Sequence, residues 1–199
     1  MFGLSDLAVP ILGAPMAGGP GTPALAAAVS NAGGLGFLAA GYLTAEKFAD
    51  GIAAVRVATT GPIGVNLFVP QPSLADRAAL DRYREELTPL AESYGTAPGR
   101  THPDDDAWDA KIDVVADTAP ELASFTFGCP SAETLARLRK RGVLTAVTVT
   151  SLDEAGIAVG AGADALVVQG PEAGGHRGTF DPGRRPGEEP LDSLLSAIG

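Results

Sequence analysis

The stretch that decides the fold covers residues 164–178 and has the sequence DALVVQGPEAGGHRG. A short apolar run, 164–168, comes first, and a glycine-rich loop that contains His176 follows it directly. An apolar run of this length, bounded by turn residues, is typical of a strand that is buried on both faces. The sequence therefore predicts a strand of a parallel sheet with a functional loop at its carboxyl end, where α/β folds place their sites.

The same alternation of short apolar runs with helical patterns extends over most of the chain. Five further strands are predicted, at residues 9–14, 35–38, 62–68, 122–127 and 143–147. Helices are predicted to begin just after the N-capping residues Thr22, Thr44, Ser131 and Ser151, and a last helix covers 191–198. Such alternation indicates an α/β fold, a parallel sheet covered by helices. An open doubly wound sheet and a closed eight-stranded barrel both satisfy the pattern.

One long segment interrupts this rhythm. Residues 71–119 contain two predicted helices, 74–94 and 107–118, with a polar loop at 96–106 between them. Connections of this length often cover an active site. About six βα units are counted in the 199 residues, whereas a closed barrel usually needs about 250 residues.

Composition excludes several classes of function. The net charge of −10 argues against nucleic acid as a partner, because phosphate backbones require a basic surface. The single cysteine, Cys129, cannot form an intrachain disulfide, which is compatible with the reducing cytoplasm. Neither a signal peptide nor an apolar run long enough to cross a membrane is recognised in the sequence.

Two glycine-rich loops are the candidate site segments. In the first, residues 13–21, glycine permits close approach of the backbone to a flat ligand, and Met16 offers a polarizable surface to an aromatic ring. In the second, residues 169–178, backbone N–H groups could bind an anion, and His176 could act as a general base, because histidine ordinarily titrates near neutral pH. The alternative for the first loop is a flexible turn without a ligand. The alternative for the second is a surface loop in which His176 makes one structural hydrogen bond.

Other polar residues are weaker candidates. Asn66 could orient a ligand or merely cap the backbone at the end of a strand. Cys129 is interpreted as a small buried residue, and His102 and the acidic run 104–106 as solvated. No metal site is expected, since the sequence has no zinc-ligand spacing, and it has no phosphate-loop or dinucleotide-binding motif.

Several of these segments resemble the nitronate monooxygenases, formerly called 2-nitropropane dioxygenases. The segments are 14–19 (APMAGG), 30–36 (SNAGGLG), 64–66 (GVN), 124–128 (SFTFG) and 169–178 (QGPEAGGHRG). They cover nearly all of the chain in the right order, and the last is the most specific. The resemblance implies an FMN-dependent (β/α)₈ barrel of the TIM type, truncated after about six βα units. Residues 1–199 would then be one incomplete FMN-binding barrel with a helical insertion around 71–119.

The resemblance also implies an activity and roles for residues. The enzyme would oxidise alkyl nitronates with O₂ to a carbonyl compound and nitrite, with the redox chemistry supplied by the flavin. His176 would take the α-proton of a neutral nitroalkane, and would mainly position the anion when a nitronate is supplied. The cofactor-binding residues would be Ala14, Pro15 and Met16 along the isoalloxazine ring, Asn66 and Gln169 as hydrogen-bonding partners, and Gly170, Gly174 and Gly175 as lining.

In this family, the cofactor phosphate is held by loops after strands seven and eight, which the sequence does not contain. We therefore expect the chain alone to bind FMN weakly, to be unstable, and to associate with itself through exposed strand edges. An FMN-dependent enoyl-acyl-carrier-protein reductase of the same barrel type is one alternative. A non-catalytic barrel fragment is a second, and a nucleotide dehydrogenase that uses Cys129 is a weaker third.

Overall fold

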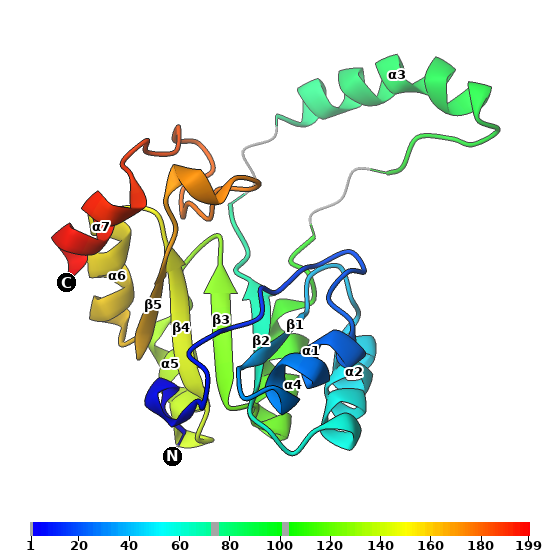
Figure 1. Ribbon diagram of the computed structural model, residues 1–199. Coiled ribbons are helices and arrows are strands. Elements are labelled where there is room, and N and C mark those ends of the chain that lie inside the picture. Colours follow the sequence, from blue (N-terminus) through cyan, green and yellow to red (C-terminus); the bar gives the residue numbers. More distant parts are fainter. Residues whose placement is uncertain (1, 73–75, 101–103) are drawn as a thin grey trace. The chain divides into compact units, whose positions relative to one another are not determined.

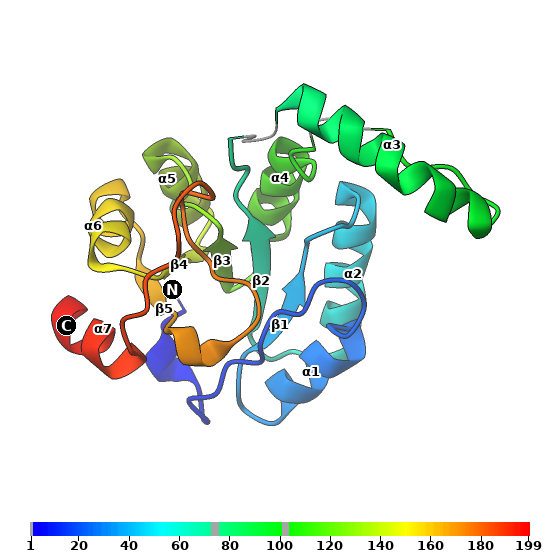
Figure 2. The same ribbon diagram turned by 90° about the horizontal axis from the view of Figure 1, so that it is seen from above.

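The computed structural model describes residues 2–72, 76–100 and 104–199. Five parallel strands form one sheet in the order of the sequence, as Figures 1 and 2 show. The strands are β1 (Gly36–Ala39), β2 (Ile63–Phe68), β3 (Leu122–Thr126), β4 (Leu144–Val149) and β5 (Ala165–Val168). Within the described ranges, β5 pairs only with β4. The α/β class expected from the alternation of strands and helices is confirmed.

Helices precede, connect and follow the strands and lie along one side of the sheet (Figure 2). They are α1 (Pro23–Asn31), α2 (Ala45–Ala58), α4 (Trp108–Thr118), α5 (Ala132–Lys140), α6 (Leu152–Ala161) and α7 (Leu191–Ile198). Short 3₁₀ helices cover Leu4–Asp6 and Pro171–Ala173. None of the helices in the described ranges is both long and apolar enough to cross a membrane.

Side-chain caps explain where these helices begin. The hydroxyl of Thr22 accepts a hydrogen bond from the backbone N–H of Leu25 at 3.1 Å, which satisfies one donor of the first turn of α1. The predicted caps Thr44, Ser131 and Ser151 make the equivalent bond three residues ahead. At α6, the second half of the expected capping box differs, because Glu154 accepts from the backbone of Thr150 instead of Ser151.

Two clusters of apolar side chains stabilise the sheet from its two faces. The larger one fills the space between the sheet and the helices, with Phe48 and Phe125 among its largest members. The smaller one, Leu35, Phe37, Leu122 and Ala146, lies on the opposite face, which we call the inner face. Successive side chains of a strand point to opposite faces, so β1, β3 and β4 each contribute to both clusters.

The strand predicted at residues 9–14 is wrong. This segment makes one isolated parallel bridge, between Leu12 and Leu35, next to β1. The N–H groups of Val9 and Gly13 bond to the oxygens of Gly33 and Leu35, but the N–H of Ile11 between them turns back to the oxygen of Val9 at 2.7 Å. Pairing with residues 33–35 is therefore interrupted at Ile11, and no regular strand forms.

The segment predicted as an insertion at residues 71–119 divides into two parts in the structure. Pro72–Asp105 form a compact unit of their own that contains α3 (Arg77–Ser93). In contrast, α4 belongs to the α/β unit, where it packs against α2 and α5. The predicted helix start at Leu74 lies outside the described residues, and α3 begins at Arg77 after its cap Asp76.

Candidate active site

Polar side chains gather on the inner face near the carboxyl ends of the strands. Asn66 of β2 is 4% exposed, and its amide nitrogen donates to the hydroxyls of Ser124 at 2.9 Å and Thr126 at 3.0 Å. The hydroxyls of Thr126 and Thr148 lie 3.4 Å apart. Three neighbouring strands thus present a connected row of hydrogen-bonding groups, with Asn66 at its β2 end and Thr148 at its β4 end.

A cavity of about 750 Å³ opens over this row. Its size lies in the ordinary range for sites that bind small molecules and cofactors, roughly 300–1,000 Å³. Five residues singled out in the sequence line it, Pro15, Asn66, Gln169, Gly170 and His176. Residues from four strand ends and from the N-terminal segment, far apart in the sequence, therefore meet at one place.

Aromatic rings form one wall of this cavity. Tyr42 meets Phe68 edge to face with 5.7 Å between ring centroids, and Phe68 lies 5.0 Å from Phe127. Phe127 in turn contacts the imidazole of His176 edge to face at 6.3 Å. Phe127 follows β3 directly and has a φ of 71°, a left-handed conformation that is unusual for a bulky residue. The wall favours a flat apolar ligand, and His176 stands at its end.

The loop after β5 is held by hydrogen bonds from side chains. Gln169 accepts from the N–H of Gly178 at 2.7 Å and donates to the carbonyl oxygen of His176 at 3.1 Å. Glu172 accepts from the N–H of Leu191 at 3.2 Å, at the start of α7. A Cβ on Gly170 would lie 2.8 Å from the backbone nitrogen of Leu191, which cannot move aside as a flexible side chain can, so this position requires glycine.

The other predicted cofactor residues lie outside this cavity. Met16 lines a neighbouring cavity of about 430 Å³ that shares Ala17 and Tyr42 with the first. Ala14, Gly174 and Gly175 are exposed and are not among the lining residues of either cavity. The cofactor roles of all four stay predictions.

Sequence reasoning missed several lining residues, including Tyr42, Phe68, Thr126, Phe127, Thr148 and Glu172. The alternation of side chains along each strand could have found three of them, because Phe68, Thr126 and Thr148 share the inner face with Asn66. Tyr42 and Phe127 follow the ends of β1 and β3, and only the packing of those loops brings their rings together.

The structure also describes the surroundings of Cys129 and Arg177, two further residues considered in the sequence. Burial raises the pKa of the Cys129 thiol, which disfavours the thiolate that a nucleophile needs and agrees with the interpretation as a small buried residue. Arg177 donates to the carbonyl oxygen of Gly187 at 2.9 Å and does not line the cavity. His102 lies outside the described residues. The described ranges hold no group of three or more His, Cys, Asp or Glu side chains suited to a metal ion.

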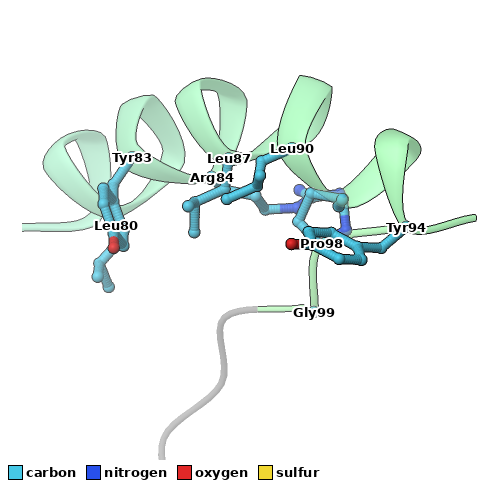
Figure 3. Close-up of a pocket in the computed structure, with 9 residues that line it drawn as sticks. Leu80, Tyr83, Arg84, Leu87, Leu90, Tyr94, Pro98 and Gly99 are labelled. Atoms are coloured by element: carbon cyan, nitrogen blue, oxygen red, sulfur yellow. The ribbon is translucent and has the colours of Figure 1, made fainter. Parts of the chain in front are cut away.

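The unit Pro72–Asp105 has a cavity of its own, of about 360 Å³. Figure 3 shows that side chains of α3 project from one side of the helix, where Pro98 and Gly99 lie on the returning chain. The lining side chains of α3 include Leu80, Tyr83, Leu87 and Leu90. The spacing of these residues, three or four apart, places them on one helical face. None of the sequence-derived site residues lies here.

Comparison with known proteins identifies the family. The sequence profile described as "Nitronate monooxygenase" matches residues 3–198. The chain belongs to the nitronate monooxygenase family. A nitronate monooxygenase of Paraburkholderia phytofirmans is 44% identical over 177 residues, 87% of this chain and 48% of the relative. One of Pseudomonas aeruginosa is 41% identical over 200 residues, 96% of this chain and 56% of the relative.

Solved structures agree with this membership. The chain superimposes on nitroalkane oxidase from Streptomyces ansochromogenes with a TM-score of 0.88 and 45% identity, over 98% of this chain and 56% of that one. For FabK from Thermotoga maritima, the TM-score is 0.67 and the identity 26%, over 98% and 48%. This chain spans about half the length of the curated relatives it matches. The expected fold, α/β of the TIM-barrel type, is confirmed.

Proposed function

We propose that the chain forms the flavin site of an enzyme that oxidises alkyl nitronates and nitroalkanes with O₂, giving a carbonyl compound and nitrite. The observation that supports this most directly is the meeting of Asn66, Gln169 and His176 around one cavity, at the carboxyl edge of the sheet. Membership of the nitronate monooxygenase family supports the reaction class. The substrate would be a small nitro compound, with O₂ as the second reactant.

The residues around the cavity fit FMN. Within the described ranges, all three hydrogen bonds of the Asn66 side chain go out from its nitrogen, so Oδ1 is available to a donor such as a ring N–H. Gly174 and Gly175 adopt positive φ and have open space around their Cα atoms, which leaves backbone groups accessible to a polar ligand. Asn66, Gln169, Gly170 and the aromatic wall would hold the ring, and Ala14, Pro15 and Met16 would lie along it. Bound FMN would supply the electron transfer to O₂.

His176 would act on the proton of a neutral nitroalkane. A ring nitrogen takes the proton, the α C–H bond breaks, and its electron pair moves into the nitro group to give the nitronate. The imidazole is exposed at the end of the aromatic wall and packs edge to face with the ring of Phe127. It makes no hydrogen bond to another described residue. Its nitrogens are therefore accessible to a substrate. A nitronate supplied directly needs no proton transfer, and the same side chain would then orient the anion.

The first experiment compares the 199-residue chain with His176→Ala. Absorption spectra with and without added FMN measure flavin binding, and O₂ uptake measures turnover of a nitronate and of its parent nitroalkane. We expect His176→Ala to retain flavin binding and to lose roughly 10²–10⁴-fold in kcat/KM on the nitroalkane, with a smaller loss on the nitronate. His102→Ala, the matched variant at the other histidine of the sequence, should leave both values unchanged. Equal losses on both substrates would contradict the role of His176 as a base.

The alternatives give different results in the same assays. An FMN-dependent enoyl-acyl-carrier-protein reductase would consume NAD(P)H with an enoyl thioester and would not oxidise nitronates. The higher identity to the nitroalkane oxidase, 45%, than to FabK, 26%, favours the nitronate reaction. A non-catalytic fragment would bind no flavin and turn over neither substrate. A cytoplasmic location and self-association belong to the proposal, and size-exclusion chromatography tests the latter.

A further inference from the structure

A side chain at the end of β5 ties the loop that bears His176 to the sheet. Gln169 lies directly after β5, and its amide oxygen accepts from the N–H of Gly178 at 2.7 Å. Its amide nitrogen donates to the carbonyl oxygen of His176 at 3.1 Å. An amide side chain can accept and donate at the same time, which a carboxylate or an ammonium group cannot do. Gln169 therefore holds the backbone on both sides of Arg177.

Close packing strengthens this attachment at Gly178. A Cβ built on Gly178 would lie 3.0 Å from the methyl group of Thr148 and 3.4 Å from that of Thr126. The backbone of Gly178 thus rests against the polar row at the cavity floor. From Gly174 to His176, in contrast, the residues are exposed, and two glycines in succession have positive φ.

We propose that Gln169 is a positioning residue that fixes the imidazole of His176 over the cavity. The tie to the His176 carbonyl oxygen and the contact of its ring with Phe127 together define where the ring nitrogens lie. A base must lie within hydrogen-bonding reach of the proton that it takes, and small displacements are costly in rate. The consequence for catalysis rests on the proposed function, whereas the placement of the ring does not.

The placement is tested by NMR of the histidine rings. The sequence has two histidines, His102 and His176, so a spectrum of the imidazole C–H groups of the full chain contains few signals, and His176→Ala assigns them. Methionine resembles glutamine in length and is uncharged, but it has no N–H to donate and only a weak acceptor. In Gln169→Met, we expect the His176 signals to lose the ring-current shift caused by Phe127 and to move toward those of an exposed histidine. The His102 signals should not change.

Gln71→Met is the matched control. Gln71 holds the next part of the same loop, donating to the carbonyl oxygens of Thr179 at 3.0 Å and Phe180 at 3.2 Å, without touching His176. We expect Gln71→Met to leave the His176 signals in place. Equal shifts in both variants would show that the loop is held as a whole and would overturn the assignment to Gln169. Unchanged His176 signals in Gln169→Met would overturn it as well.

Gln169→Glu provides a second variant if the methionine variant does not fold. The glutamate keeps an acceptor for Gly178 but cannot donate to His176 when it is ionised. We expect the His176 signals to move in the same direction, by less than in Gln169→Met. Unmoved His176 signals in this variant would show that the bond to the His176 carbonyl oxygen does not place the ring.

Kinetics then separate positioning from a purely structural role. With Gln169→Met at saturating FMN, we expect the ratio of kcat/KM on a neutral nitroalkane to that on its nitronate to fall about tenfold, as the loss of one or two hydrogen bonds allows, since a lost flavin contact would affect both substrates alike. In a His176→Ala background, the same substitution should not lower this ratio further, because its effect on proton transfer passes through His176. If the proposed function fails, both activities are absent in the parent chain, and the NMR result still decides the placement. An additional tenfold loss in this ratio in the His176→Ala background would contradict the proposal.

Discussion

The ammonium nitrogen of Lys111 lies 2.7 Å from Oδ1 of Asp106, and only 1% of the Lys111 side chain is exposed. The same carboxylate oxygen accepts from the backbone N–H of Tyr42 at 3.0 Å. Tyr42 has a φ of 65° and begins the aromatic wall of the cavity. One ion pair of α4 therefore stabilises a strained residue of the candidate site.

Removing the carboxylate should destabilise the fold strongly. Asp106→Ala leaves the buried ammonium group of Lys111 without this counter-ion, so we expect the free energy of unfolding to fall by about 3 kcal/mol or more. The double variant Asp106→Ala, Lys111→Met removes the buried charge as well and should recover at least half of that loss. Urea denaturation followed by circular dichroism measures both. A loss below about 1 kcal/mol in the single variant would show that the pair contributes little.

Asp164 should make stability depend on pH in the acid range. Partial burial raises the pKa of its carboxyl group, but hydrogen bonds from Thr145 and the guanidinium of Arg139 outweigh burial, so the pKa is lowered in the folded protein. The stabilisation is complete above the unfolded pKa, about 3.9 for aspartate, and is lost as the pH falls through the lower folded value.

Asp164→Asn should therefore lower the free energy of unfolding at pH 7 and flatten its decrease below about pH 4. Urea denaturation at a series of pH values provides the measurement. Asp113→Asn is the control, because the ion pair of Asp113 with Arg137 is exposed and should contribute less than about 1 kcal/mol. An unchanged acid limb in Asp164→Asn would contradict this account.

Two glycines of opposite environment give a matched pair of stability predictions. A Cβ on Gly36 would lie 1.8 Å from the backbone oxygen of Ala26, so Gly36→Ala must separate α1 from β1 and should cost about 3 kcal/mol or more. Gly156 lies exposed within α6 with open space around it, so Gly156→Ala should stabilise the helix by about 0.5–1 kcal/mol. Thermal unfolding of both variants is the check, and a change of the same sign in both would refute the steric argument.

Asn66 should matter both for the cofactor and for the stability of the sheet. Asn66→Leu keeps the volume of the side chain but leaves the hydroxyls of Ser124 and Thr126 without their amide donor. We expect FMN affinity to fall about tenfold. The free energy of unfolding should fall by about 1–3 kcal/mol, because the two hydroxyl groups lose their hydrogen-bond donor. Fluorescence titration with FMN gives the affinity. Thr118→Val, on the exposed end of α4, is the control and should leave the affinity unchanged.

Local patterns in the sequence predicted most of the fold correctly. The caps Thr22, Thr44 and Ser131 precede helices as expected, because a hydroxyl three residues before a free N–H is a purely local arrangement. The run 9–14 shows where such patterns fail. It is apolar enough for a strand, but the N–H of Ile11 bonds back to the oxygen of Val9, which interrupts the pairing with residues 33–35.

The candidate site was predicted in its parts and not in its arrangement. Sequence motifs singled out Asn66, Gln169 and His176, and the structure places all three around one cavity. That Tyr42 and Phe127 would form the wall beside them was not predicted: Tyr42 belongs to no motif, and the segment 124–128, which contains Phe127, carried no assigned role. The cofactor roles assigned to Met16 and its neighbours stay predictions.

The sequence by itself determined the alternation of strands and helices, the helix caps and the family, because these depend on residues close together along the chain. Only the tertiary structure decided which side chains meet. Asn66 bonds to Ser124 and Thr126 because of the register between β2 and β3. Gln169 bonds to Gly178 because the loop between them folds back toward the end of β5. Contacts between residues far apart in sequence depend on how the elements pack, and packing is set by the whole core at once.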